Sequence, residues 1–168
     1  GSFPMGPKVM ERYAPVGGVV MQGTSAEIIA KKWDISREDM DAWAARSHQR
    51  AIAAIDAGKF VDEILPLKVQ QLDGSVVDFS VDEHPRRDTT AEKLAQLKVL
   101  HPEIEGFSIT AGNACGGNDA AAALTIASDT LGLPALGTVL SWASVGVDPA
   151  ETGLAPVEAI PKALARAG

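Results

Sequence analysis

The sequence predicts a mixed α and β fold, and three observations lead to this prediction. Alanine is abundant while aromatic residues make up only 5% of the chain, which favours helices packed closely through small side chains. Hydroxyl residues followed three positions later by a carboxylate indicate helix starts. Two β-prone runs flank Asp73-Gly74, a dipeptide typical of hairpin turns. With 46% apolar residues, the 168-residue chain has enough apolar surface to bury a core.

Capping boxes predict three helix starts: Thr24 with Glu27, Ser36 with Asp39, and Thr89 with Glu92. The second start opens a helix expected from about 37 to 57, because apolar residues continue at helical spacing and Gly58 follows as a C-terminal stop. The third opens a helix expected from about 90 to 98. The stretch from 3 to 23, rich in Gly, Pro and Met, is expected to be irregular.

A two-stranded ribbon is expected around Asp73-Gly74, with strands near 64–69 and 76–79. Residues 107–110 lead into a glycine-rich loop, and the apolar run 120–126 is either a buried strand or a buried helix. Residues 139–147 are expected to form a strand. The segment 156–167 has helical character, with Pro161 expected to break or kink it.

Charge and composition exclude several classes of partner and site. A net charge of -7 argues against nucleic acid and anionic membranes, which excess Lys and Arg would hold. The single cysteine, Cys115, excludes an internal disulfide or a cysteine-cluster zinc site, and the three histidines lack metal-ligand spacing. No apolar run is long enough to span a bilayer and no leader pattern opens the chain, so a cytoplasmic location is expected.

The stretch from Ser108 to Ala122, Ser-Ile-Thr-Ala-Gly-Asn-Ala-Cys-Gly-Gly-Asn-Asp-Ala-Ala-Ala, resembles the thiolase motif T-A-G-N-(A/S)-S-G-x-N-D-G-A-A-A. Two further regions resemble thiolases in the same order along the chain. They are Ile35-Ser36-Arg37-Glu38 through Arg46-Ser47-His48-Gln49, and Val145-Gly146-Val147-Asp148-Pro149 through Lys162-Ala163-Leu164. The resemblance covers almost the whole chain.

The resemblance implies an α/β, thiolase-like fragment. Thiolases pack two similar halves with α-β-α-β-α layering, and a mixed α+β loop domain folds over coenzyme A. By this likeness, residues 1–115 are the loop domain, 116–135 the end of the N-terminal half and 136–168 the start of the C-terminal half.

The resemblance also implies an acyl-CoA C-acyltransferase, which moves an acyl group between CoA thioesters by Claisen condensation or thiolytic cleavage in fatty acid and lipid metabolism. The nucleophilic cysteine, the N-E-A-F and G-H-P-x-G segments and the C-x-G-G-G cysteine of thiolases have no match here, so no catalytic residue is assigned. The implied small-molecule partner is acyl-CoA, without prosthetic group or metal, in a homodimer or homotetramer. The alternative is a noncatalytic thiolase-like protein that binds acyl-CoA or lipid, or acts as a scaffold.

Carried over by position, the resemblance assigns CoA contacts to two stretches: Ala111, Gly112, Cys115 and Gly116 along the pantetheine arm, and Arg86, Arg87 and Lys93 near the adenine and phosphates. Met21 and Gln22 would line the substrate pocket, in place of the usual His-Met. Without the resemblance, the loop is a tight turn and the cations a solvated face. Cys115 is equally well a small, semi-buried residue, and His48 is given no role. The three tryptophans are expected in the core.

Overall fold

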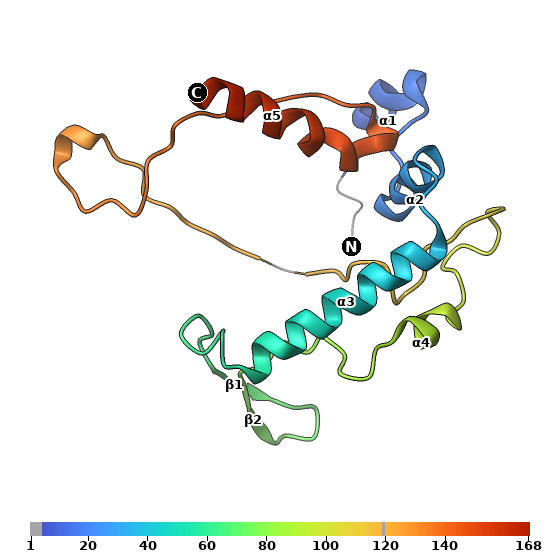
Figure 1. Ribbon diagram of the computed structural model, residues 1–168, viewed down its shortest axis with the longest axis horizontal. Helices are drawn as coiled ribbons and strands as arrows, with labels where there is room; N and C mark the ends of the chain where they lie inside the picture. Colours follow the sequence, from blue (N-terminus) through green and yellow to red (C-terminus); the bar gives the residue numbers. More distant parts are fainter. Residues whose placement is uncertain (1–4, 119) are drawn as a thin grey trace. The chain divides into compact units, whose positions relative to one another are not determined.

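The computed structural model describes residues 5–118 and 120–168, which divide into two compact units (Figure 1). One unit is Ile35–Gly116. The other combines the chain before Ile35 with the chain after Gly116. The predicted limits of a loop domain, 1–115, remain a prediction.

The long helix α3 (Arg37–Asp56) organises the Ile35–Gly116 unit. Ser36 caps it, because its hydroxyl accepts the backbone N–H of Asp39 at 3.0 Å, as the capping box predicts. The predicted stop at Gly58 is also confirmed. Gly58 has a φ of +66°, and the N–H groups of Gly58 and Lys59 donate to the carbonyls of Ile55 and Ala54, which satisfies orphan acceptors of the last turn.

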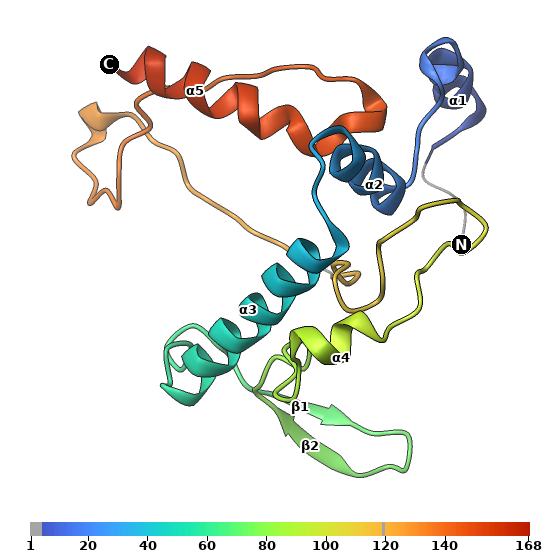
Figure 2. The same cartoon turned by 45° about the vertical axis from the view of Figure 1, so that its right-hand side comes forward.

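The predicted ribbon is confirmed as the antiparallel pair β1 (Leu67–Gln70) and β2 (Val76–Phe79), visible in Figure 2. Leu67 pairs with Phe79, and Gln70 pairs with Val76. In the connecting loop, Gly74 has a φ of +84°, a conformation that glycine adopts without steric cost. All eight strand residues are exposed, so this ribbon gains little from apolar burial within its unit.

A small core lies between α3 and the segment that leads into the glycine-rich loop. It contains Ala45 of α3, Leu94 of α4 (Ala91–Ala95), Phe107 and Ile109. Beyond α4, Val99 forms an isolated antiparallel bridge with Thr110. The prediction of a helix from 90 to 98 is therefore right in place but too long. Its cap is Thr90, which accepts the N–H of Lys93, so the Thr89 and Glu92 box is off by one residue.

The second unit contains α1 (Pro7–Tyr13), the 3₁₀ helix Ala14–Val16, and α2 (Gln22–Lys32). The prediction of irregular structure for residues 3–23 was wrong over α1, which Pro7 opens at a first-turn position where its missing N–H costs nothing. The Thr24 and Glu27 capping box was also wrong, because α2 begins at Gln22 and Thr24 lies inside it. A 3₁₀ helix, Pro149–Leu154, packs against α2, and Lys32 pairs with Glu151 at 2.7 Å.

The strands expected in the second unit are absent from its described residues. Residues 120–126 form neither a strand nor a helix, and 139–147 is irregular. Residues 120–126 are exposed, and 139–147 alternates between exposed and half-buried residues, with 72% of the Trp142 surface exposed. A strand needs a hydrogen-bonded neighbour, and no described segment supplies one. The core positions expected for the tryptophans were wrong as well, since Trp33 and Trp43 are also exposed.

The last helix, α5 (Ala155–Ala167), contains Pro161 and continues past it. Of the two expected effects of Pro161, a break or a kink, the break does not occur. Ser141 donates to the carbonyl of Ala163 at 2.6 Å, and the Arg166 guanidinium donates to the carbonyl of Trp142 at 2.7 Å, so the irregular chain before α5 is tied to its last turns. Among the residues that the structure describes, no helix is long and apolar enough to cross a membrane.

Candidate functional site

The glycine-rich loop begins at Thr110, a fully buried residue at 0% exposure. The N–H of Thr110 donates to Asn113 Oδ1 at 2.7 Å, and its own hydroxyl accepts the N–H of Gly112 at 3.2 Å. The N–H of Ala114 donates to the Thr110 carbonyl at 3.0 Å. The first turn of the loop is therefore closed on itself by local hydrogen bonds, and the bridge from Thr110 to Val99 holds its first residue.

A buried polar network ties this loop to α3. Asp41, only 2% exposed, accepts from Arg37 Nε at 2.7 Å and from Asn113 Nδ2 at 3.0 Å. Arg37 Nη2 also donates to the carbonyls of Leu94 and Leu97, at 2.7 and 3.3 Å. A buried carboxylate is tolerated where donors satisfy its oxygens, and both oxygens of Asp41 are occupied here. The network fixes the loop and the end of α4 against one helix.

Two glycines of the loop are needed where they are because neighbouring side chains leave no room for a Cβ. A methyl group on Gly112 would run into Leu94 and Leu97, and one on Gly116 would run into the ring of His84. Gly116 thus brings the loop against the segment that carries Arg86. The predicted contact residues at 111–116 and those at 86–93 lie in one unit, and the loop touches His84 and Leu94, which flank the second segment.

The segment before α4 is anchored to α3 by two side chains. His48 Nδ1 accepts the backbone N–H of Arg86 at 3.1 Å. The guanidinium of Arg87 forms a two-pronged pair with the carboxylate of Asp56, at 2.9 and 2.7 Å. The hydrogen bonds from Arg87 hold the pKa of Asp56 below its ordinary value, and Asp56 in turn raises the pKa of Arg87.

The predicted cations differ in what they hold. Lys93 pairs with Asp88 at 2.9 Å, and this hydrogen bond holds the pKa of Asp88 low. Arg87 is paired with Asp56. The exposed Arg86 guanidinium has no hydrogen bond or ion pair within residues 5–118 and 120–168. Arg86 acts on Asp88 through charge at longer range, where it helps to lower the pKa of that carboxyl. Of these three predicted cations, Arg86 is the one that can contact an anion or an aromatic ring without first breaking a hydrogen-bonded ion pair.

The other predicted contacts are placed as follows. Cys115 is exposed at the end of the loop, and Ala111 is exposed at its start. Met21 and Gln22 are exposed residues at the start of α2, in the other unit. Their predicted place in a substrate pocket remains a prediction. Within the described ranges, no group of three or more His, Cys, Asp or Glu residues is arranged to hold a metal ion.

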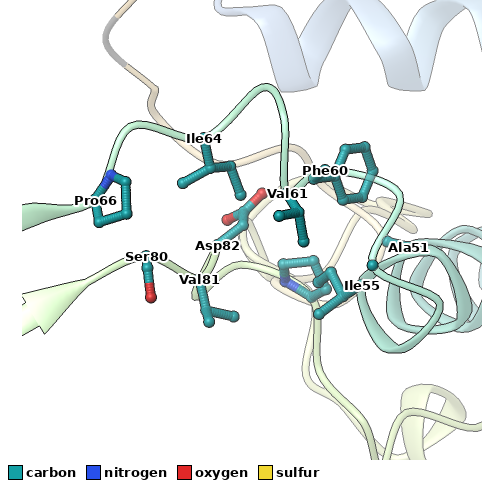
Figure 3. Close-up of a pocket in the computed structure, with 11 residues that line it drawn as sticks. Ala51, Ile55, Phe60, Val61, Ile64, Pro66, Ser80, Val81 and Asp82 are labelled. Atoms are coloured by element: carbon teal, nitrogen blue, oxygen red, sulfur yellow. The ribbon is translucent and has the colours of Figure 1, made fainter.

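One concave feature was missed from the sequence. A pocket of about 480 Å³ lies beside the end of α3, where Ile55, Phe60, Val61 and Ile64 supply apolar walls (Figure 3). Asp82 is the ionisable residue that lines it, and Pro85, next to Arg86 in the chain, also lines it. The apolar residues Phe60, Val61 and Ile64, which follow the Gly58 stop, were the available signal.

The sequence analysis also missed Asp41 and His48, the two α3 side chains that hold the predicted contact segments. Asp41 was detectable in part, because Arg37 precedes it by one helical turn, a spacing at which opposite charges meet. The partner of His48 is 38 residues away, and no local spacing predicts it.

Comparison with known proteins places this chain in a family. The family model described as "Thiolase, N-terminal domain" matches residues 13–130. An acetyl-CoA acetyltransferase of Pseudomonas aeruginosa is 49% identical over 150 residues, which are 87% of this chain and 38% of the relative. A probable acetyl-CoA acetyltransferase of Escherichia coli K12 is 46% identical over 151 residues. The chain thus spans less than two fifths of the length of these relatives.

The solved structures agree in fold. The acetyl-CoA acetyltransferase from Syntrophomonas wolfei superposes with a TM-score of 0.73 at 36% identity, covering 91% of this chain and 38% of that one. The enzyme of the same name from Bacillus anthracis gives 0.72, also at 36% identity. On the matched residues, the identities and the shared α/β fold, this chain belongs to the thiolase family.

Proposed function

We propose that the protein carrying this chain is a thiolase-type acyl-CoA C-acyltransferase, and that the Ile35–Gly116 unit supplies part of its coenzyme A site. One observation carries the proposal for the unit. The unpaired, exposed Arg86 guanidinium stands on a segment that is anchored to α3 and packed against the glycine-rich loop through Gly116. The names of the relatives, acetyl-CoA acetyltransferases and a beta-ketothiolase, support the reaction class.

Coenzyme A has two ends with different demands. Its adenine and phosphates suit a planar cation, so Arg86 stacks on the ring while Arg87 and Lys93 reach phosphate oxygens by exchanging their carboxylate partners. Its pantetheine arm is narrow and carries amides, so the small residues Ala111, Gly112, Cys115 and Gly116 let it approach the backbone closely. Met21 and Gln22 line the acyl end in this proposal.

In this reaction a cysteine thiolate accepts the acyl group and oriented donors hold the thioester oxygen as negative charge develops on it. Cys115 is not assigned to that role, because it stands in the glycine-rich loop where the family motif has a serine. The reacting groups come from the parts of a thiolase that this chain does not match. The loop-domain limits, the α-β-α-β-α layering, a homo-oligomeric state and a cytoplasmic location in lipid metabolism belong to the same proposal.

Titration calorimetry of coenzyme A with the full-length protein tests the site. Arg86→Ala is expected to weaken binding about 2- to 5-fold, the range for loss of one exposed cation and ring contact. Arg50→Ala is the matched control, because Arg50 is an exposed arginine of α3 with no partner among the described residues. Equal affinity of Arg86→Ala and wild type would remove Arg86 from the site. Coenzyme A binding without acyl transfer between thioesters would favour a noncatalytic binding protein instead.

A further inference from the structure

We infer that His48 is a positioning residue for coenzyme A: it holds the backbone at Arg86 so that the exposed guanidinium is presented to the adenine end of the ligand. This inference rests on the proposed function and adds a residue that the ligand itself need not touch. Its basis is one hydrogen bond, from the Arg86 N–H to His48 Nδ1 at 3.1 Å, across 38 residues of sequence.

The direction of this hydrogen bond determines which tautomer the neutral imidazole of His48 adopts. A backbone N–H only donates, so Nδ1 must be the acceptor and the ring proton of the neutral histidine must lie on Nε2. Local bonds hold the chain on both sides of Arg86. The His84 N–H donates to Asp82 Oδ1 at 3.0 Å, and the Thr89 N–H donates to the Arg86 carbonyl at 3.4 Å. His48 supplies the tie from this turn to α3.

The position of His48 on α3 explains why this tie matters for a ligand with two ends. Asp41 precedes His48 by seven residues, which is about two turns and about 10 Å along the helix, on nearly the same face. Asp41 holds Asn113 of the glycine-rich loop, and His48 holds Arg86. Eight residues further, Asp56 holds Arg87. The rise of α3 therefore sets the spacing between the two predicted contact segments.

Loss of the His48 acceptor is expected to affect one end of the ligand only. Without it, the turn at Arg86 must be ordered when coenzyme A binds, and that ordering weakens the complex. The glycine-rich loop keeps its own anchor at Asp41. A thioester that lacks the adenine and its phosphates makes no use of Arg86, so its binding should not change.

Steady-state acyl transfer by the full-length protein, with acetyl-CoA and with acetylpantetheine, separates the two ends. His48→Ala is expected to raise KM for acetyl-CoA about fivefold, the value of one hydrogen bond, with kcat and the KM for acetylpantetheine unchanged. His48→Asn, whose amide oxygen can replace Nδ1, is expected to restore most of the loss. His48→Gln extends its amide toward the position of Nε2 and should behave like the alanine variant. Gln49→Ala, an exposed neighbour on α3, is the control.

The outcomes distinguish this inference from the proposal beneath it. If Arg86→Ala raises KM for acetyl-CoA while His48→Ala and His48→Gln do not, His48 has no positioning role and the ligand site stands. A rise in KM for both thioesters, or an asparagine variant as weak as the glutamine one, would also overturn the inference. If Arg86→Ala itself leaves the KM for acetyl-CoA unchanged, the proposed coenzyme A site is refuted, and the inference on His48 is refuted with it. Should the alanine variant not fold, the comparison of asparagine with glutamine decides the matter.

Discussion

The substitution Asp41→Asn tests whether the network on α3 holds the glycine-rich loop. Asparagine keeps the size of the side chain and one oxygen acceptor but removes the charge that Arg37 and Asn113 face. A hydrogen bond to a charged group contributes about 1.5–3 kcal/mol, against about 0.5–1.5 kcal/mol for a neutral one. The two donors reach different oxygens of Asp41, so asparagine keeps one bond in neutral form and loses the other. The lost bond costs about 1.5–3 kcal/mol and the weakened one about 1 kcal/mol, which together is about 2.5–4 kcal/mol.

Partial exposure of Arg37 reduces that figure. Its side chain is 21% exposed, whereas that of Asp41 is 3% exposed, so water compensates part of the charge left on Arg37. We therefore expect a loss of about 2–3 kcal/mol, which is about a 30- to 150-fold rise in the population of the locally open loop. Hydrogen exchange of full-length protein measures this directly, because amides in 107–116 exchange through local opening.

The expected result is faster deuterium uptake in peptides covering 107–116, with little change in peptides covering β1 and β2. Glu38→Gln is the control, because it removes one negative charge from an exposed residue of the same helix. The double variant Asp41→Asn with Asn113→Asp exchanges the two groups and should recover part of the protection. Unchanged uptake in 107–116 for Asp41→Asn would refute the account of the network.

Three further predictions concern single features. Gly116→Ala drives a methyl group into the ring of His84 and is expected to lower the free energy of unfolding by about 1–3 kcal/mol, measured by thermal unfolding. Adding His84→Ala to the same chain should recover most of that loss, and additive losses of stability would contradict the contact. Ser36→Ala removes the cap of α3 and should cost about 1 kcal/mol of helix stability in denaturant unfolding. Pairing with Arg87 lowers the pKa of Asp56 below 3.8, so the pair stabilises the fold above that pH and the contribution is lost as pH falls through the lowered value. The stability of Asp56→Asn should differ from that of wild type at neutral pH and converge with it in acid. A difference in stability that stays constant with pH would contradict the pairing.

Local signals in the sequence predicted the elements that local chemistry determines. The start of α3 at Ser36 and its end at Gly58 each depend on hydrogen bonds within a few residues, and both were predicted correctly. The ribbon around Asp73-Gly74 was predicted for the same reason. The box at Thr24 failed because several nearby positions compete as the start of a helix, and α2 begins earlier, at Gln22.

Features that depend on distant partners were not predictable in this way. The runs 120–126 and 139–147 are apolar enough for strands, but a strand requires a neighbour, and the sequence does not say whether one is present. At the candidate site, the glycine-rich loop and Arg86 were identified by family resemblance, while their anchors, Asp41 and His48, became visible only when α3 was seen beside them. The pairing of Arg87 with Asp56 was likewise not foreseeable from a cluster of charges.

The left-handed residue at Gly58 has a consequence for the apolar pocket beside α3. By reversing the chain, it brings Phe60 and Val61 to the pocket that Ile55 also lines, so the cavity is a product of how the helix terminates. The residues that line it do not include Asp41, His48 and Asp56, the three acceptors on α3 that hold the neighbouring segments. Bulk can be trimmed or added at Phe60, or a fluorinated reporter ring installed there, and the spacing along α3 is left intact.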